Sequence, residues 1–195
     1  MKKFSYFCSL FLAFSFLAFC GCGLISDAVR EGVEQTKLVQ SGTTIQGEGF
    51  SIRVPRDGYY LVRDNPIRGA LCLRAQGNYY GGSYNVYPFT LSTPALSLEA
   101  ALQAHMKKCM NRTFLRDYKI LSQHTNVWQG SDSCFHNGYV PSDFFSASCV
   151  TRRGTNYFWI VRSNVLLHES PDTNDIKRAE KELQTFLDGI RFDLP

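Results

Sequence analysis

The chain of 195 residues contains seven cysteines and four histidines, the side chains best suited to nucleophilic or metal chemistry. A thiolate beside an imidazole can act as a nucleophile, and Cys134 and His136 lie two residues apart on one side of a predicted strand. Cys134 is also a candidate disulfide half, which competes with a catalytic role. His105 falls on the apolar stripe of a predicted helix, whereas His124 and His168 lie in polar stretches where we expect solvated side chains.

Other catalytic and metal-binding patterns are missing from the sequence. There is no HExxH, HxH or CxxC spacing, so the sequence predicts no metal site. The run Gly81-Gly82-Ser83-Tyr84-Asn85 lacks the second glycine of a nucleophile elbow. No glycine-rich phosphate loop follows a predicted strand, and the few carboxylates lie in turns or helix caps. We therefore expect a protein that is not an enzyme and that has no catalytic residue, cofactor or metal.

The N-terminal stretch predicts where the protein resides. Two lysines precede an uncharged apolar run, Phe4 to Phe19, which is typical of an export signal. Cys22 follows the small residue Gly21, and this arrangement resembles bacterial lipoprotein signals, in which cleavage exposes a cysteine that is then acylated. The resemblance departs at Phe19, where those signals have an aliphatic residue, so Cys20 is the alternative lipid site. An ordinary cleaved signal and an uncleaved membrane anchor are the other two interpretations.

This interpretation divides the chain into a signal peptide (1–21), a lipidated tether (22–48) and a single globular domain (49–195). The expected location is the cell envelope, where the N-terminal lipid binds the membrane. Gly23 in place of an aspartate favours the outer membrane, facing the periplasm, by the same resemblance, and the inner membrane stays open. Removing Lys2 and Lys3 leaves 19 of 21 basic residues against 17 acidic ones, a net charge of about +2 that predicts no nucleic-acid binding.

Four cysteines remain after the leader and the lipid site are set aside. They are Cys72, Cys109, Cys134 and Cys149. An even number in an oxidising compartment predicts two disulfides, and four cysteines allow three pairings. We favour Cys134–Cys149, which closes a short loop, together with Cys72–Cys109. The alternative is that these thiols are buried and unpaired, where they act as small apolar side chains.

The expected elements alternate short strands with two helices. Apolar side chains at helical spacing predict a helix over Ser97 to Arg112 and a second helix that ends near Gly189. Ser170 is the expected cap of the second helix, with Pro171 in its first turn and the Asp172 carboxylate at its positive end. β-branched and aromatic residues predict a hairpin of Phe144–Thr151 and Tyr157–Val165. Strands interrupted by single helices indicate an α+β fold with an antiparallel β-sheet flanked by helices.

Several of these segments together resemble the PsbP-like proteins. The segments are the early strand Phe50 to Pro55, the helix opening Ser97-Leu98-Glu99, the hairpin, and the terminal helix that ends in Phe186 to Phe192. The resemblance covers about Gly49 to Phe192 and implies an α/β/α sandwich. It also implies that the domain acts by binding, and it transfers no catalytic residue to this chain.

The expected function is therefore that of a membrane-anchored, non-catalytic, extracytoplasmic interaction domain with an envelope protein as its partner. The alternative is a periplasmic small-molecule or lipid-binding module. Tyr79, Tyr80 and Tyr84 form a candidate binding groove, because tyrosines make amphipathic contacts. Arg152 and Arg153 lie at the predicted hairpin turn. They could contact anionic lipid headgroups or an acidic partner, and a solvated turn is the simpler interpretation.

Overall fold

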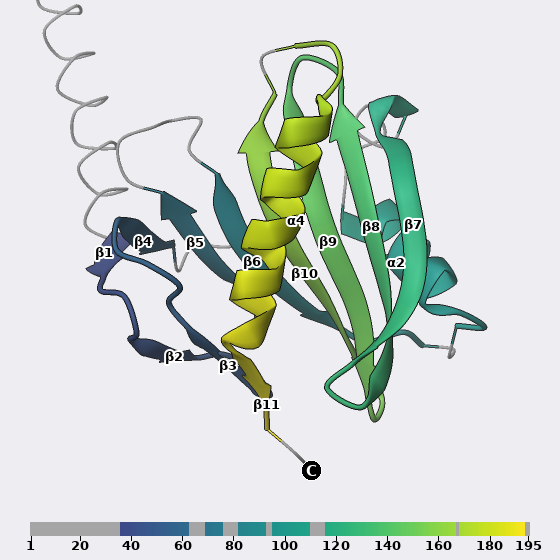
Figure 1. Ribbon diagram of the computed structural model, residues 1–195. Helices are drawn as coiled ribbons and strands as arrows, with labels where there is room; N and C mark the ends of the chain where they lie inside the picture. Colours follow the sequence, from purple (N-terminus) through teal and green to yellow (C-terminus); the bar gives the residue numbers. More distant parts are fainter. Residues whose placement is uncertain are drawn as a thin grey trace, which may run out of the picture. The chain divides into compact units, whose positions relative to one another are not determined.

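In the computed structural model, almost all of the described fold belongs to the unit Leu38–Pro195 (Figure 1). The residues that the structure describes are 36–62, 69–75, 82–92, 95–109, 116–166 and 168–193. The predicted signal peptide, both candidate lipid sites and most of the predicted tether lie outside these residues.

The described part consists of strands and two helices, which confirms the α+β class. The helices are α2 (Leu98–Cys109) and α4 (Thr173–Asp188). The strands, in chain order, are β1 (Thr36–Val39), β2 (Thr44–Gln46), β3 (Phe50–Arg53), β4 (Tyr59–Val62), β5 (Leu71–Ala75), β6 (Ser83–Phe89), β7 (Lys119–Trp128), β8 (Ser131–Val140), β9 (Phe144–Arg153), β10 (Asn156–Val165) and β11 (Ile190–Phe192).

The main sheet has eight strands in the order β1-β4-β5-β6-β10-β9-β8-β7, and a second sheet has the order β11-β3-β2. The centre of the main sheet is the antiparallel pair β6–β10, whose strands are far apart in the sequence. On one side of it, β10, β9, β8 and β7 form consecutive antiparallel hairpins, so that β7 lies at one edge of the main sheet.

The two helices cover opposite faces of the main sheet, as Figure 1 shows with α4 in front of β9 and β10 and α2 behind the sheet. Side chains alternate between the faces along each strand. Beneath α4 lies the larger core, in which Phe186 and Leu187 pack with Ile160 and Cys149. Beneath α2 lies a smaller core that includes Trp159. The arrangement confirms the predicted α/β/α sandwich.

Local sequence signals account for the turns and helix starts. Gln129 and Gly130 both have positive φ, 48° and 76°, as a tight hairpin turn between β7 and β8 requires. The helix α4 begins with a capping box, in which Asp172 accepts from the Asp175 amide and the Asp175 side chain accepts from the Asp172 amide. The hydroxyl of Ser97 accepts from the Ala100 amide at the start of α2. The predicted hairpin and both predicted helices are thus present.

The domain begins earlier than residue 49, so the predicted boundary of the tether at residue 48 is wrong. The strand β2 pairs with β3, with Ile45 opposite Ile52, and Val39 is buried in the larger core. Val39 and Ile45 lie among polar residues and glycines, so the sequence around them shows no clear strand pattern.

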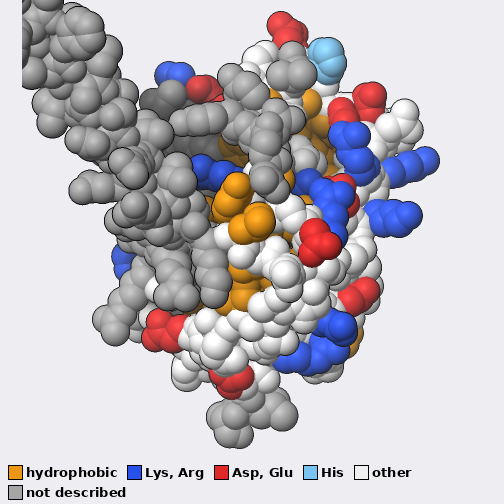
Figure 2. Space-filling model, turned by 90° about the vertical axis from the view of Figure 1, so that its left-hand side faces the viewer, with side chains coloured by type: hydrophobic (Ala, Val, Ile, Leu, Met, Phe, Trp, Pro, Cys, Tyr) orange, Lys and Arg blue, Asp and Glu red, His pale blue; other side chains and the backbone are white. Residues whose placement is uncertain are grey.

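The outward side of α4 is charged. Lys177, Arg178 and Lys181 are all exposed. In Figure 2, Lys and Arg side chains gather along the right-hand side, where α4 lies, with acidic side chains between them. The mixture of signs indicates a solvated helix surface rather than a field of one sign.

Candidate functional site

Three tyrosines were predicted to form a binding groove, and the structure describes one of them, Tyr84. Tyr84 does not line a surface groove. Tyr84 is only 2% exposed, and its ring stacks on Phe186 with centroids 4.5 Å apart. It also meets the edge of the Tyr59 ring at 5.4 Å. Tyr79 and Tyr80 lie outside the described residues. Tyr84 is therefore a core residue beneath α4, and its proposed role in a surface groove is wrong.

The favoured disulfides are also wrong, because Cys72, Cys134 and Cys149 are free thiols. All three are buried, as in the alternative interpretation. Cys134 pairs in register with Val150, and Cys149 pairs with Phe135, so the two cysteines occupy neighbouring positions on adjacent strands and face opposite sides of the sheet. A bridge between them would have to pass through the sheet. The side chain of Cys109 lies outside the described part of the chain.

We expect these thiols to resist alkylation in the folded protein. Burial raises the pKa of both Cys134 and Cys149 to about 12, so almost no thiolate is present at pH 8. Peptide mass spectrometry after iodoacetamide treatment should find both peptides unmodified without denaturant and fully modified in guanidinium chloride. Peptides that stay unmodified in denaturant until a reductant is added would show that a disulfide forms after all.

Two histidines lie in the interior. Burial lowers the pKa of His105 and His136 to about 4, so both rings are neutral at neutral pH. The hydroxyl of Ser148 lies 2.9 Å from His136 Nε2. Because Cys134 holds its proton and His136 is engaged with Ser148, the Cys134–His136 pair lacks the activated thiolate of a nucleophilic site.

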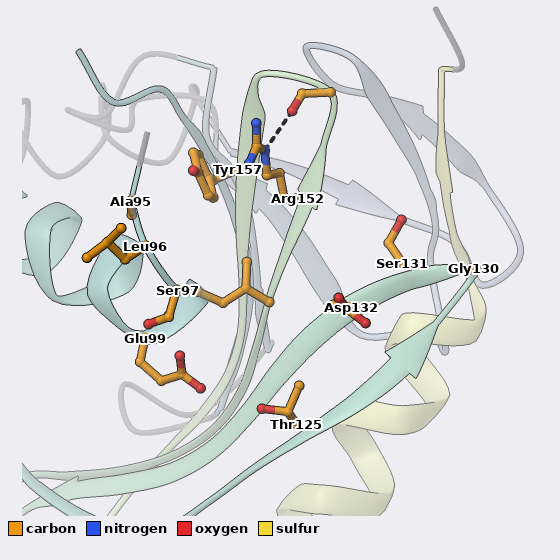
Figure 3. A pocket seen from close by; sticks show the side chains of 12 residues that line it. Ala95, Leu96, Ser97, Glu99, Thr125, Gly130, Ser131, Asp132, Arg152 and Tyr157 are labelled. Carbon is orange, nitrogen blue, oxygen red and sulfur yellow. Dashed lines mark hydrogen bonds between the residues drawn. The ribbon is translucent and has the colours of Figure 1, made fainter. Parts of the chain in front are cut away.

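A cavity of about 670 Å³ lies where α2 begins, beside the turns of two hairpins (Figure 3). Its charged lining consists of Glu99, Asp132 and Arg152. A hydrogen bond from Ser97 is the main cause that lowers the pKa of Glu99, so this carboxyl is ionised at neutral pH and cannot serve there as a general acid. Arg152 Nε donates to the Gly154 carbonyl across its own turn at 2.8 Å. The cavity is a polar hollow without a paired acid and base.

A groove of about 260 Å³ runs between α4 and β7. Its apolar floor includes Phe135 and Leu183, and the His124 ring stacks on Phe135 with centroids 5.3 Å apart. Asn137 Nδ2 donates to Glu180 Oε1 at 2.6 Å, which ties the floor of the groove to the helix. All residues that line this groove belong to the described part, and one of its walls is the edge strand of the sheet.

The edge strand β7 is exposed along almost its whole length. Its first nine residues are exposed, and only Trp128 is buried. Three of the exposed side chains are large and apolar: Ile120 (51%), Leu121 (44%) and Val127 (64%). A bulge lies at Leu121, where the register with β8 shifts. An edge strand presents unpaired backbone N–H and C=O groups, which a second extended segment can pair with.

A second hollow, here called the serine pocket, lies on the α2 face of the main sheet and has a volume of about 300 Å³. Its polar lining residues are Ser83, Ser146, Ser163, Asn85 and Arg74, and its aromatic lining residues are Tyr87, Tyr118, Phe144 and Trp159. Small polar side chains among aromatic walls, in a concave site, are typical of small-molecule pockets. The sequence carried no signal for this pocket, because its residues come from five separate segments.

Two arginines act inside the structure in ways that the sequence did not indicate. Arg153 Nη2 donates to the Trp128 carbonyl at 3.2 Å, and its guanidinium lies over the Phe192 ring at 4.6 Å. Arg162 is 4% exposed and forms an ion pair with Glu182 at 2.7 Å. Arg153 is thus a structural residue, whereas a solvated position was the simpler interpretation of its place at the hairpin turn.

The described residues form neither a metal site nor a membrane-spanning helix. No group of three His, Cys, Asp or Glu side chains within them could hold a metal ion. No helix that the structure describes is long and apolar enough to span a bilayer.

Comparison with solved structures supports the fold. The solution structure of cyanobacterial PsbP (CyanoP) from Synechocystis sp. PCC 6803 matches with a TM-score of 0.56 and 11% sequence identity, covering 79% of this chain and 94% of that chain. The fold is therefore PsbP-like, as the sequence resemblance implied. No protein-family model and no curated protein sequence matches the chain.

Proposed function

We propose that this protein is a membrane-anchored lipoprotein of the bacterial cell envelope, most simply of the outer membrane, that acts as a non-catalytic extracytoplasmic interaction domain. A lipid on Cys22 would attach the N-terminus to the membrane, since the apolar leader ends at a cysteine preceded by a small residue. The partner would be an envelope protein that supplies an extended segment.

The observation that carries the binding role is the open edge of β7. This ten-residue strand pairs only with β8 within the described residues, and it borders the groove beneath α4. An extended segment added to such an edge gains main-chain hydrogen bonds, and its alternate side chains enter the neighbouring groove. Ile120 and Val127 give that segment apolar contact on the edge itself.

A role without catalysis agrees with the chemistry of the described residues. The buried thiols have raised pKa values, and the buried imidazoles are neutral and enclosed. Glu99 lies in the cavity at the start of α2 and has a lowered pKa, the opposite of what a general acid needs at neutral pH.

The anchor is tested by the Cys22→Ser variant. We expect it to lose labelling by radioactive palmitate and to move from the membrane fraction to the soluble fraction, because acylation requires the thiol at the cleavage site. Cys20→Ser is the matched control and should keep both label and membrane location. Loss of label in Cys20→Ser, with retention in Cys22→Ser, would assign the lipid to Cys20.

The binding surface is tested by photo-crosslinking in intact envelopes. A photoreactive residue at Val127 on β7 should give a discrete crosslinked product, whereas one at exposed Lys181 on α4 should not. Adding Ile120→Lys should reduce the Val127 product by at least about fivefold, because a charge on the edge disfavours strand addition. Equal products from both positions, or no effect of Ile120→Lys, would reject β7 as the interface. These outcomes are independent of the lipid site.

A further inference from the structure

The serine pocket carries an inference that goes beyond partner binding at β7. Ser83, Ser163 and Ser146 lie side by side on three neighbouring strands, with Ser163 opposite both of the others in register. Because serine side chains are small, they leave space above the sheet at the floor of the pocket. Tyr118 and Phe144 form one wall, with their rings stacked and the ring centroids 6.2 Å apart. The cavity of about 300 Å³ is at the small end of the range for ligand sites.

The floor of the pocket is a connected set of hydrogen-bonding groups. The hydroxyls of Ser83 and Ser163 are 2.8 Å apart, and Asn85 Nδ2 donates to Ser83 Oγ at 2.9 Å. The hydroxyls of Tyr118 and Ser146 are 3.4 Å apart. Since hydroxyl groups rotate to donate or accept, this floor can adapt its donors to a bound acceptor.

The lining of the serine pocket contains many hydrogen-bond donors, and its charge is positive. Trp159 is 3% exposed, and its indole Nε1–H has no hydrogen-bond partner within the part of the chain that the structure describes. A buried donor without a partner is costly, and an acceptor from a ligand would relieve that cost. Arg74, opposite Ser83 in register, is the only charged side chain in the lining, and no ion pair to it is present among the described residues.

From this lining we infer that the serine pocket binds a small organic carboxylate with an apolar or aromatic body. Arg74 and Ser83 would hold the carboxylate at the rim, because a guanidinium forms charge-assisted hydrogen bonds with that group. The apolar body would lie between the aromatic side chains of Trp159 and Tyr118. A cationic ligand would meet no lining carboxylate, and a neutral ligand would leave the charge of Arg74 unused.

The test follows the two indole N–H signals in a nitrogen-edited NMR spectrum, because the chain has two tryptophans on opposite faces of the sheet. The probes are 3-phenylpropanoate and octanoate. Either probe should shift the Trp159 signal in a saturable manner, with a dissociation constant of about 1 mM or below. The Trp128 signal, which comes from the larger core on the opposite face of the sheet, should not move.

Three comparisons decide whether Arg74 recognises the carboxylate. Binding should be about tenfold weaker in Arg74→Met, and about tenfold weaker for neutral 3-phenylpropanamide on the unchanged protein. Arg152→Met removes an exposed arginine outside the pocket and should leave binding unchanged. The inference is overturned if neither carboxylate shifts the Trp159 signal, or if the amide binds as tightly as the acid. It is also overturned if Arg152→Met weakens binding as much as Arg74→Met.

Discussion

The Leu183→Asp variant is expected to be unfolded at room temperature. Leu183 lies on α4, is 4% exposed and packs in the larger core with Ala179 and Phe186. Truncating a buried leucine to alanine already costs about 2–5 kcal/mol. An unpaired carboxylate at that position adds the cost of desolvating a charge. The sum reaches the total stability of a typical domain, about 5–15 kcal/mol.

Circular dichroism during thermal and urea unfolding measures this effect. Leu183→Asp should show no cooperative transition, and Leu183→Ala should lower the free energy of unfolding by about 2–5 kcal/mol. Lys181→Asp on the exposed side of the same helix is the matched control and should change it by less than about 1 kcal/mol. A Leu183→Asp protein with an unchanged melting temperature would mean that α4 does not pack through this residue.

The Arg162→Met variant should lose about 3 kcal/mol of stability, because it breaks a largely buried ion pair and leaves one charge behind. The Arg162 guanidinium bonds Glu182 Oε2 through Nε at 2.8 Å and lies 4.8 Å from the centre of the Tyr84 ring. It therefore joins β10, β6 and α4 at one point. Since Glu182 is partly exposed, the lower end of the usual cost for such a pair is expected.

A double-mutant cycle separates the pair from its surroundings. Removing both partners in Arg162→Met with Glu182→Leu should cost at least about 1 kcal/mol less than the sum of the single changes. The pair Arg178–Asp175 on the exposed side of α4, at 2.7 Å, is the control, and Arg178→Met should cost less than about 1 kcal/mol. Equal costs for Arg162→Met and Arg178→Met would show that the buried position of the first pair does not matter.

Elements defined by local signals could be predicted from the sequence. The cap of α4 and the alternation along β9 and β10 act over a few residues, so these elements lie close to where the pattern placed them, although the cap is Asp172 and not Ser170. The antiparallel hairpins and the two helix stripes were enough to predict the α+β class. The boundary at residue 48 was missed because β2 is three residues long and depends on pairing with β3.

The candidate site depended on tertiary contacts and was predicted poorly. Periodicity shows that the side chains of Tyr84 and its neighbours point to alternate faces of the strand. It does not show that the ring of Phe186, on α4, covers Tyr84. Loop length favoured a Cys134–Cys149 bridge, whereas the hairpin register directs the two thiols to opposite faces. The open edge at β7 follows from the strand order, which no local pattern encodes.

By itself, the sequence determined the local elements and the composition of each strand face, and it predicts an N-terminal export signal. Only the tertiary structure decided which faces are covered, which strand is left at the edge, and that Arg74, Ser83 and Trp159 line one pocket. The physical reason is range: caps, turns and periodicity act between near neighbours in the chain. Burial and strand order depend on contacts such as that between β6 and β10, which are separated by more than sixty residues and are set when the whole core packs.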